Sequence, residues 1–411
     1  MDFEILQGMP TVTFNALFVL GIGALSFLLG GLIKANVPLF QRLSLPVPFL
    51  GGFPVALVCC LLKVTGTLHV AFDPAVPQIA LKFFMCCLAL FGSWKLLKGS
   101  IFFALAFWLL ATVLGALESG FGIMLAKLLG LDPLYGILMG AVSLMGGMDT
   151  YHQFAASFAI LSGEDVAGIV RGAGTLGILM ALSLGAPFGE WMIRRYKLTN
   201  RDYPESNNRF LEYFLSSHPK PFYQYLSKEV IRTFALVCVS VALGDLVSQA
   251  VSPWMTVPQF LSGMIVAILL RIGLDAADIC LVEGLALRTM TKATLTIFIA
   301  TNVCALQLDT LANLHWQMYV ILIGQLMLNL AFARFGYFML LGRNYDAMML
   351  AVGGVGFSMG ITANGLSNMQ SLCEKYGPCM RTIFIVSVVG TILIGLTNSL
   401  TVGWMLSYGF Q

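Results

Sequence analysis

The sequence has 411 residues, of which 58% are hydrophobic and only 10% are charged, and its formal net charge is +3. Soluble globular domains carry about 25% charged residues, so this composition excludes an ordinary soluble domain, and the weak net charge gives no reason to expect nucleic acid as a partner. The chain is therefore predicted to be an all-α polytopic membrane protein, because lipid leaves an unpaired backbone amide without a partner.

Apolar runs follow one another along the whole chain, separated by short polar turns. A crossing helix needs about 20 apolar residues, so we expect some runs to be single spans and others to be fused, broken or re-entrant. No basic leader precedes the first run, which is expected to be the first span and not a removable signal peptide. The runs cover residues 12–33, 45–62, 76–94, 100–129, 134–147, 166–193, 230–250, 257–274, 279–306, 316–341, 346–362 and 381–406.

The longest polar stretch of the chain is residues 194–229, which divides it almost at its middle. We interpret it as a linker between an N-terminal membrane repeat, 1–193, and a C-terminal membrane repeat, 230–411. The linker is rich in Lys and Arg, so the positive-inside rule places it in the cytoplasm, and both termini are expected outside. Its basic residues are Arg194, Arg195, Lys197, Arg201, Arg209, Lys220 and Lys228.

The two halves contain matching spacings of small residues in the same order. Asp132, Gly140 and Gly146 are matched by Asp346, Gly354 and Gly360, and Leu50, Gly52, Val55 and Ala56 are matched by Leu261, Gly263, Val266 and Ala267. Duplicated halves are typical of secondary transporters. If each half crosses the membrane an odd number of times, the repeat is inverted and the substrate site lies near the midplane, where the halves meet.

The glycine-rich segments 130–150 and 342–365 are the candidate site. Each begins with an aspartate, Asp132 or Asp346, that we expect to cap a helix. A helix that stops inside the membrane frees backbone groups that must bind an ion, a ligand or water. The alternative is that these glycines only allow close helix packing. The predicted substrate-binding residues are Gly146, Gly147, Asp149, Thr150, Ser358, Thr362 and Asn364, and the predicted ion-binding residues are Ser143, Glu118 and Asn368.

Glu118 is an ionisable residue deep within the apolar run 100–129. Ionisable residues inside a membrane are functional candidates by default, here for a proton or another cation. The alternative is a satisfied hydrogen bond between helices. No cofactor is expected, and Na⁺ is expected only as a coupling ion, because the four histidines and nine cysteines show no metal-ligand spacing.

Three segments resemble signature regions of the bacterial sodium/glutamate symporter family: GLDPLYGILMGAVSLMGG at 130–147, GRNYDAMMLAVGGVGF at 342–357 with SNMQSLCEKYGP at 367–378, and LPVPFLGGFPVAL at 45–57. The resemblance runs over essentially the whole chain. It implies a Na⁺-coupled symporter of amino-acid anions in the bacterial inner membrane, with inverted repeats of about five spans each. It also implies broken or re-entrant segments at the site, and a homodimer that moves its substrate by an elevator-like shift.

The chain departs from the family pattern at the expected substrate site. Met148 and Asp149 stand where the family has a histidine and a glycine, and Thr362, Ala363 and Asn364 stand where it has Thr-Pro-Thr. A fixed anion at Asp149 repels a dicarboxylate unless a cation neutralises it. Besides glutamate, the sequence therefore leaves open a neutral or cationic amino acid, another organic solute, or a proton-coupled cycle.

An intramembrane aspartyl protease is the rival from another class, because Tyr345-Asp346 and Gly147-x-Asp149 loosely match its two motifs. The motifs stand in reversed order and the second is incomplete, so we do not expect an enzyme. A passive channel lacks a filter sequence. The chain also has no phosphate-binding loop for ATP-driven transport.

Overall fold

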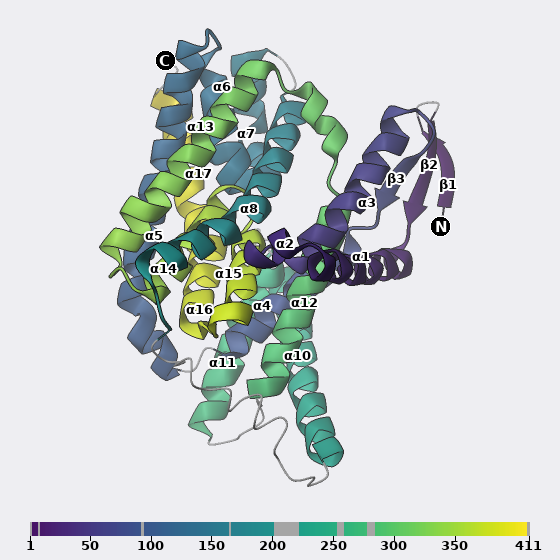
Figure 1. The fold of residues 1–411 in the computed structure, drawn as a ribbon, viewed down its shortest axis with the longest axis vertical. Helices are drawn as coiled ribbons and strands as arrows, with labels where there is room; N and C mark the ends of the chain where they lie inside the picture. The colour runs from purple at the N-terminus through teal and green to yellow at the C-terminus, as the bar shows by residue number, and fades with distance from the viewer. Residues whose placement is uncertain are drawn as a thin grey trace.

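The computed structural model describes residues 2–6, 9–91, 94–163, 166–200, 222–252, 259–277 and 284–408. Almost all of this chain is helical (Figure 1). Eight of its helices are long and apolar enough to cross a membrane, which confirms the prediction of an all-α polytopic membrane protein. They are Ala16–Asn36, Val47–Val64, Ile101–Leu128, Ala167–Tyr196, Val230–Val251, Gln259–Ala276, Trp316–Phe338 and Arg381–Ser407.

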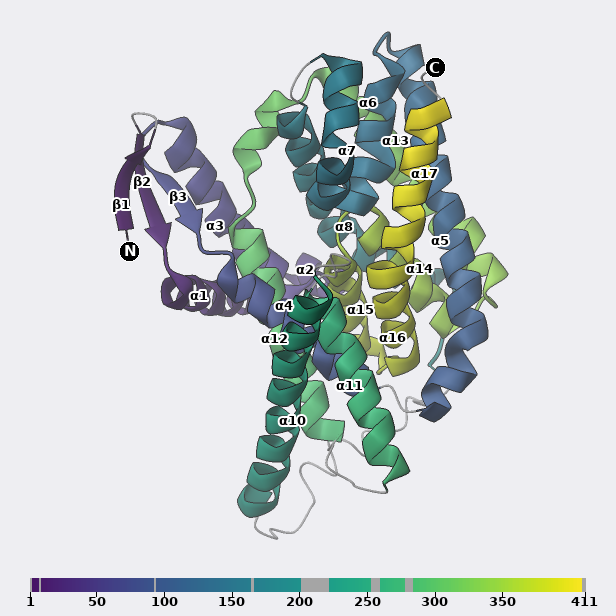
Figure 2. The same ribbon diagram turned by 180° about the vertical axis from the view of Figure 1, so that it is seen from behind.

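The helices form two groups, and we call the first the arm bundle. Its members pack on one another around α4 and α12, while α1 and α3 project to one side and α10 and α11 extend to another, as Figures 1 and 2 both show. The arm bundle comprises α1 (Ala16–Asn36), α2 (Pro38–Arg42), α3 (Val47–Val64), α4 (Ala75–Phe91), α10 (Phe222–Val251), α11 (Gln259–Ala276) and α12 (Gly284–Cys304).

The second group, the core bundle, contains every residue of the predicted site. In the first half of the chain it comprises α5 (Trp94–Leu128), α6 (Pro133–Ile137), the π-helix η1 (Leu138–Gly146), α7 (Gly147–Ser162) and α8 (Ala167–Tyr196). In the second half it comprises η2 (Leu308–Asn313), α13 (Trp316–Phe332), η3 (Ala333–Phe338), α14 (Tyr345–Ser358), α15 (Thr362–Tyr376), α16 (Met380–Val388), η4 (Val389–Leu393) and α17 (Ile394–Tyr408).

A small three-stranded sheet lies at the N-terminal end of the arm bundle (Figure 1). Strand β1 (Asp2–Leu6) pairs antiparallel with β2 (Met9–Phe14), and β2 pairs parallel with β3 (His69–Phe72). The sequence analysis did not predict these strands. Residues 12–14 of the first predicted span belong to β2, so the first helix begins at Ala16.

The described part of each apolar run contains a helix, but α2, η2 and most of two longer helices lie outside the runs. Most of α7 follows the run 134–147, and α15 follows the run 346–362. Both were missed because their polar residues interrupt the apolar pattern. Of the two expected caps, Asp132 accepts a hydrogen bond from the Leu134 amide at 2.8 Å. The expected cap at Asp346 is wrong, because Asn344 caps α14 by accepting from the Ala347 amide.

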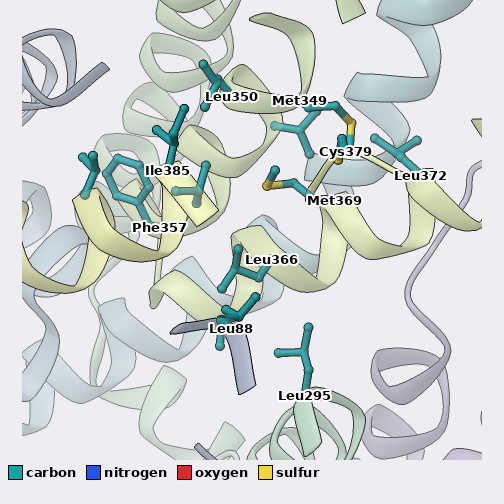
Figure 3. Packing of buried hydrophobic residues seen from close by; sticks show 14 of the residues in the cluster. Leu88, Leu295, Met349, Leu350, Phe357, Leu366, Met369, Leu372, Cys379 and Ile385 are labelled. Atoms are coloured by element: carbon teal, nitrogen blue, oxygen red, sulfur yellow. The ribbon is translucent and has the colours of Figure 1, made fainter. Parts of the chain in front are cut away.

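The two bundles meet through a continuous apolar cluster. Leu88 of α4 and Leu295 of α12, from the arm, belong to the same buried cluster as Leu366 of α15 and Phe357 of α14, from the core (Figure 3). Close packing of apolar side chains without directional bonds holds two surfaces together while leaving few hydrogen bonds to break. The arm therefore supports the helices that carry the predicted site.

Each bundle contains helices from both halves of the chain. In the arm, α1 packs on α3 and α12, whereas α10 packs on α11 and α4. In the core, α5 packs on α6, η1 and α13, and α14 packs on α15 and α8. Contacts between the two halves therefore help to hold both bundles together.

Candidate functional site

The first glycine-rich segment is interrupted at Gly147. This residue has φ 61° and ψ −155°, and it joins η1 to α7. Glycine adopts positive φ without the clash that a Cβ atom causes. A second irregularity lies at Gly140, whose φ of −108° and ψ of −128° are not helical. The predicted break at Gly146 and Gly147 is confirmed, and the kink at Gly140 was not foreseen.

The start of α7 is packed against α17. A Cβ atom on Gly146 would lie 1.9 Å from Thr150 Oγ1 and 2.8 Å from Asn398 Nδ2, so only glycine fits there. Asn398 donates a hydrogen bond from Nδ2 to the Ala141 carbonyl oxygen at 3.0 Å. A side chain from the C-terminal helix thus satisfies the carbonyl group of the residue that follows the Gly140 kink, as buried backbone groups require.

The second glycine-rich segment is interrupted between Ser358 and Thr362, where α14 ends and α15 begins. The two helices touch through their backbones, because a Cβ atom on Gly356 would lie only 2.0 Å from Gly365 Cα. No side chain caps the start of α15, and residues 362–365 include no acidic residue. The positive end of this helix dipole is therefore not neutralised by its own sequence.

Helix α8 lies against both breaks. A Cβ atom on Gly177 would lie 2.6 Å from the Met359 carbonyl oxygen, at the second break, and 2.7 Å from Leu144 Cδ2, just before the first. On the next residue of α8, Ile178 Cγ1 lies 3.3 Å from the position of a Cβ atom on Gly360. The structure therefore brings the two predicted segments to the same stretch of one helix.

The predicted substrate residues differ in exposure. Thr150, Ser358 and Asn364 are buried, Thr362 is half-buried, and Asp149 is exposed in the first turn of α7. Thr362 lies beside η4, since a Cβ atom on Gly390 would be 2.9 Å from its Oγ1 atom.

Among the described residues, the buried Nδ2 atom of Asn364 has no hydrogen-bond partner. The same holds for the Oδ1 atom of Asn368, whose Nδ2 atom donates to the Ala181 carbonyl oxygen at 2.8 Å. Unpaired buried polar atoms are costly, so these two amides are available to a ligand.

Two predicted hydroxyl groups are already engaged by the protein. Ser143 donates to the Leu138 carbonyl oxygen, and Ser358 donates to Asn329 Oδ1. Asn329 in turn donates from Nδ2 to Glu118 Oε1 at 2.8 Å. Ser358 therefore points toward α13 and α5, away from the shared face on α8.

Gln325 and Asn329 of α13 complete this buried polar network, and the sequence analysis missed both. They are four residues apart, so they lie on the same face of the helix. Gln325 donates from Nε2 to the main-chain oxygen of Glu118 at 2.6 Å. Amides spaced in this way within an apolar run were the available signal, because side-chain amides hydrogen-bond between membrane helices.

A second missed cluster surrounds Glu190 of α8, where the core meets the arm. Its carboxylate accepts hydrogen bonds from Ser44 at 2.7 Å, Tyr376 at 2.6 Å and Lys375 at 2.7 Å. Arg194 of α8 also forms an ion pair with it at 2.7 Å. Two cations thus compensate this buried carboxylate, as burial of a charge requires.

The residues 2–6, 9–91, 94–163, 166–200, 222–252, 259–277 and 284–408 contain no group of three or more His, Cys, Asp or Glu side chains that would hold a metal ion. The oxygens at the two breaks are hydroxyl, amide and carbonyl groups, together with the Asp149 carboxylate. Hard monovalent cations and small polar solutes suit such oxygens better than transition metals do.

Comparison with known proteins agrees with this architecture. The family model described as sodium/glutamate symporter matches residues 12–378. The chain is 27% identical over 390 residues to proteins named sodium/glutamate symporter from Escherichia coli K12 and Shigella flexneri, covering 94% of this chain and 96% of each relative. The Haemophilus influenzae protein of the same name is 27% identical over 391 residues, with the same coverage.

These relatives are named as symporters and not as enzymes, which confirms the predicted class. The family match covers both glycine-rich segments and both sides of the linker. The chain therefore belongs to the sodium/glutamate symporter family.

Proposed function

We propose that this chain is a Na⁺-coupled symporter that carries glutamate or a related amino-acid or organic anion across the bacterial inner membrane. The single observation that carries the proposal is the meeting of two interrupted helices on α8 around Gly177, in a chain whose relatives are named sodium/glutamate symporters. Interrupted helices at matched places in two halves are a recurrent arrangement for solute and ion sites in transporters.

The substrate carboxylate binds at the start of α15. Free backbone amides and the positive end of the helix dipole favour an anion there. The unpartnered Asn364 Nδ2 atom adds a side-chain donor, and Thr362 adds a hydroxyl group at the first residue of the helix. Ser358 lines the end of the preceding helix and supports this position through Asn329.

The coupling cation and the substrate ammonium group bind nearer the first break. Asp149 supplies a carboxylate, and Thr150 supplies a hydroxyl oxygen one residue later. The interruption at Gly146 and Gly147 frees main-chain groups for an ion, since only a ligand or water satisfies them inside a membrane. Ser143 and Asn368 are further oxygen donors, and Asn368 Oδ1 has no partner within the described chain.

A different solute is the second candidate, and Asp149 is the observation that favours it. Asp149 lies in the first turn of α7, where it neutralises the helix dipole that an anion would otherwise use. A neutral or cationic amino acid would gain an ammonium–carboxylate contact here without the repulsion that a dicarboxylate meets. The alternative therefore concerns the side chain of the substrate, while its amino-acid backbone stays the same.

We further propose an elevator-like cycle in a homodimer. Residues 1–193 and 230–411 form inverted repeats of about five spans each, the linker 194–229 is cytoplasmic, and both termini lie outside. Helix α8 extends to Tyr196 and α10 begins at Phe222, so helices enter both ends of the linker, while residues 201–221 lie outside the described chain. The arm bundle stays fixed, and the core bundle slides along the apolar surface of α4 and α12.

Radiolabelled uptake into proteoliposomes tests this function. Purified protein should take up L-glutamate when the Na⁺ concentration is higher outside the vesicles than inside. Uptake should stop when K⁺ replaces Na⁺. Thr150→Val and Thr362→Val each remove one hydroxyl group and should reduce uptake. Ser162→Ala removes a hydroxyl group from the far end of α7, where it donates to the Phe158 carbonyl oxygen, and should leave uptake unchanged. Na⁺-independent uptake, or equal uptake by all four proteins, refutes the proposal.

Screening other solutes in the same assay distinguishes the two candidates. If an excess of an unlabelled neutral or cationic amino acid inhibits the uptake more strongly than unlabelled glutamate does, the second candidate is favoured. Competition only by acidic amino acids and dicarboxylates favours the first.

A further inference from the structure

Glu118 is a carboxylic acid enclosed by the core bundle. Glu118 is fully buried, and it lies inside the long apolar helix Ile101–Leu128. Charged side chains in this setting are expensive unless a partner of opposite charge or a proton compensates them. The neighbours of Glu118 therefore decide in which form it exists.

Every hydrogen-bond partner of Glu118 is neutral. Asn329 Nδ2 donates to its Oε1 atom at 2.8 Å, and Gln325 Nε2 donates to its main-chain oxygen at 2.6 Å. Among the described residues no cation forms an ion pair with it, and its Oε2 atom has no hydrogen-bond partner. The Oε1 atom of Gln325 is a buried acceptor that also has no partner in the described chain.

The titratable groups on the elements packed against α5 do not supply the missing charge. Tyr337 of η3 is the one whose charge state interacts with Glu118, and it carries no positive charge. Arg334 bonds to Tyr196, and Arg381 stacks over the Phe103 ring. The others whose side chains the structure describes are Tyr319, which bonds to the Leu311 carbonyl oxygen, Tyr345, which bonds to the Gly377 carbonyl oxygen, Tyr135 of α6, and Asp346 in the first turn of α14.

Protonation supplies a donor on the Glu118 side chain, where the neighbouring unpaired oxygen atoms are acceptors. Protonation turns Glu118 Oε2 from an acceptor without a donor into a hydroxyl group that donates. Gln325 Oε1, on the facing helix, is an acceptor without a donor. The neutral acid also removes the cost of an uncompensated charge in lipid. In contrast, two free oxygens are too few for Na⁺, a hard cation that takes several oxygen ligands.

Glu118 touches the first broken segment directly and is linked to the second through Asn329. A Cβ atom on Gly140, at the kink of η1, would lie 2.9 Å from the Glu118 main-chain oxygen. On the other side, Asn329 links the Glu118 carboxyl group to Ser358, the last residue of α14 before the second break. A change in the hydrogen bonds of Glu118 therefore reaches the segments on each side of the proposed substrate site.

We propose that Glu118 binds and releases a proton during the transport cycle, so that this carrier responds to H⁺ as well as to Na⁺. The inference rests on the proposed transport function. The proton comes from water and adds to the carboxylate oxygen without any other bond change. When the proton leaves, the two carboxylate oxygens of Glu118 share one hydrogen-bond donor, Asn329 Nδ2. Two other donors of the same network, Gln325 Nε2 and Ser358 Oγ, already hold other groups, so a new hydrogen bond from either one would change the contacts of α13 or of the end of α14.

Infrared spectroscopy of the purified protein during a pH titration tests protonation directly. Wild type should show the C=O stretching band of a protonated carboxylic acid at neutral pH, and this band should disappear as the pH rises. Glu118→Gln, which mimics the neutral acid, should lack the band. Glu190→Gln is the matched control, because Glu190 is also buried but is paired with Arg194 and Lys375; its band should equal that of wild type.

Uptake is then measured against pH in the same proteins. Wild-type uptake should fall several-fold over the pH range in which the band disappears, and Glu118→Gln should not show this fall. An unchanged band in Glu118→Gln, or the same pH profile in both proteins, overturns the proposal. The band is measured without Na⁺ or glutamate, so its result stands even if the transported solute proves to be another one.

A second variant keeps the test decisive if Glu118→Gln does not fold. Asn329→Leu removes the one donor to the Glu118 carboxylate while nearly preserving volume. Losing a hydrogen bond to the charged form should move the midpoint of the band to higher pH by about one pH unit. A midpoint that stays unchanged overturns the proposal equally.

Discussion

The two helix breaks of the core bundle occupy matched places in the two halves but differ in packing and charge. Gly147 at the first break has positive φ and no atom of the described residues within 4 Å of its Cβ position, and the exposed Asp149 follows it. At the second break, Gly356 and Gly365 touch through their backbones, and the start of α15 carries no acid. The first break is thus open and followed by an acid, whereas the second is enclosed and followed by no acid, as the proposed cation and anion positions require.

The largest expected effect comes from filling the second break. Gly356→Val places side-chain carbons where Gly365 Cα now lies, so the α14–α15 contact must separate. We expect a loss of about 4 kcal/mol or more in the free energy of unfolding, the range of severe overpacking. Thermal unfolding of the purified protein in detergent measures it.

The matched change at the first break is Gly147→Ala. Space is available for the methyl group, so only the cost of the backbone conformation remains, about 1–3 kcal/mol, because glycine alone readily adopts φ 61° with ψ −155°. Equal losses of stability in the two variants would show that the breaks are not packed differently.

The helices that follow the two breaks, α7 and α15, also end differently. The second-largest expected effect is on the end of α15. The last turn of α15 is tied to α8 through Lys375, Tyr376 and Glu190, whereas α7 ends at Gly163 with a backbone cap. Glu190→Gln leaves two cations with a neutral partner and should cost about 2 kcal/mol in unfolding free energy. Thermal unfolding at low and high salt measures the loss.

Ser44→Ala is the control for the Glu190 cluster, because it removes only the neutral hydrogen bond from the arm. Its expected cost is about 1 kcal/mol. A larger loss in Ser44→Ala than in Glu190→Gln would contradict a role of the Lys375–Glu190 ion pair in anchoring α15 on α8.

Two substitutions about one turn apart on α8 test its contact with both breaks. Gly177→Ala places a methyl group 2.6 Å from the Met359 carbonyl oxygen and should push the breaks apart. We expect Na⁺-driven uptake to fall roughly tenfold, equivalent to ~1.4 kcal/mol. Gly174→Ala is the control, since its methyl group meets only the Ser143 carbonyl oxygen at 3.5 Å. Equal uptake by both variants would remove α8 from the site.

The smallest effect is expected at the charge of the first break. Asp149→Asn should weaken solute affinity about fivefold or less, because exposed charge interactions contribute up to about 1 kcal/mol. The difference should shrink as ionic strength rises. Glu374→Gln, which removes an exposed carboxylate paired with Lys292 at the far end of α15, should leave the affinity unchanged. An effect of Asp149→Asn that is independent of salt would contradict a through-space role.

Features with a local signal were predicted from the sequence. Hydrophobic runs indicated the helices, and paired glycines indicated the interruption at Gly146 and Gly147. Helices α7 and α15 were missed because their polar residues interrupt the apolar pattern. The cap of α14 was assigned to Asp346 instead of Asn344 because both residue types cap helices. The two strands of the N-terminal β-hairpin alternate polar and apolar residues only over four residues each, 2–5 and 11–14, and the second of these stretches continues into an apolar run.

Contacts between segments that are distant in the sequence could not be predicted from local sequence patterns. Asn329 and Glu118 are 211 residues apart, and Ser44 and Glu190 are 146 residues apart. Each is an ordinary polar residue by itself, and its role depends on the partner that folding provides. The sequence thus indicated Glu118 as a candidate, but not the neutral amides that determine its protonation.

Hydrogen–deuterium exchange tests the central claim most directly, because it observes the backbone of both breaks without substitution. Peptides covering residues 146–151 and 359–366 are compared with and without L-glutamate, in Na⁺ and in K⁺. Binding of one solute between the two breaks predicts slower exchange in both segments together, only when glutamate and Na⁺ are both present. Protection of one segment alone, or equal protection in K⁺, would contradict a shared Na⁺-coupled site.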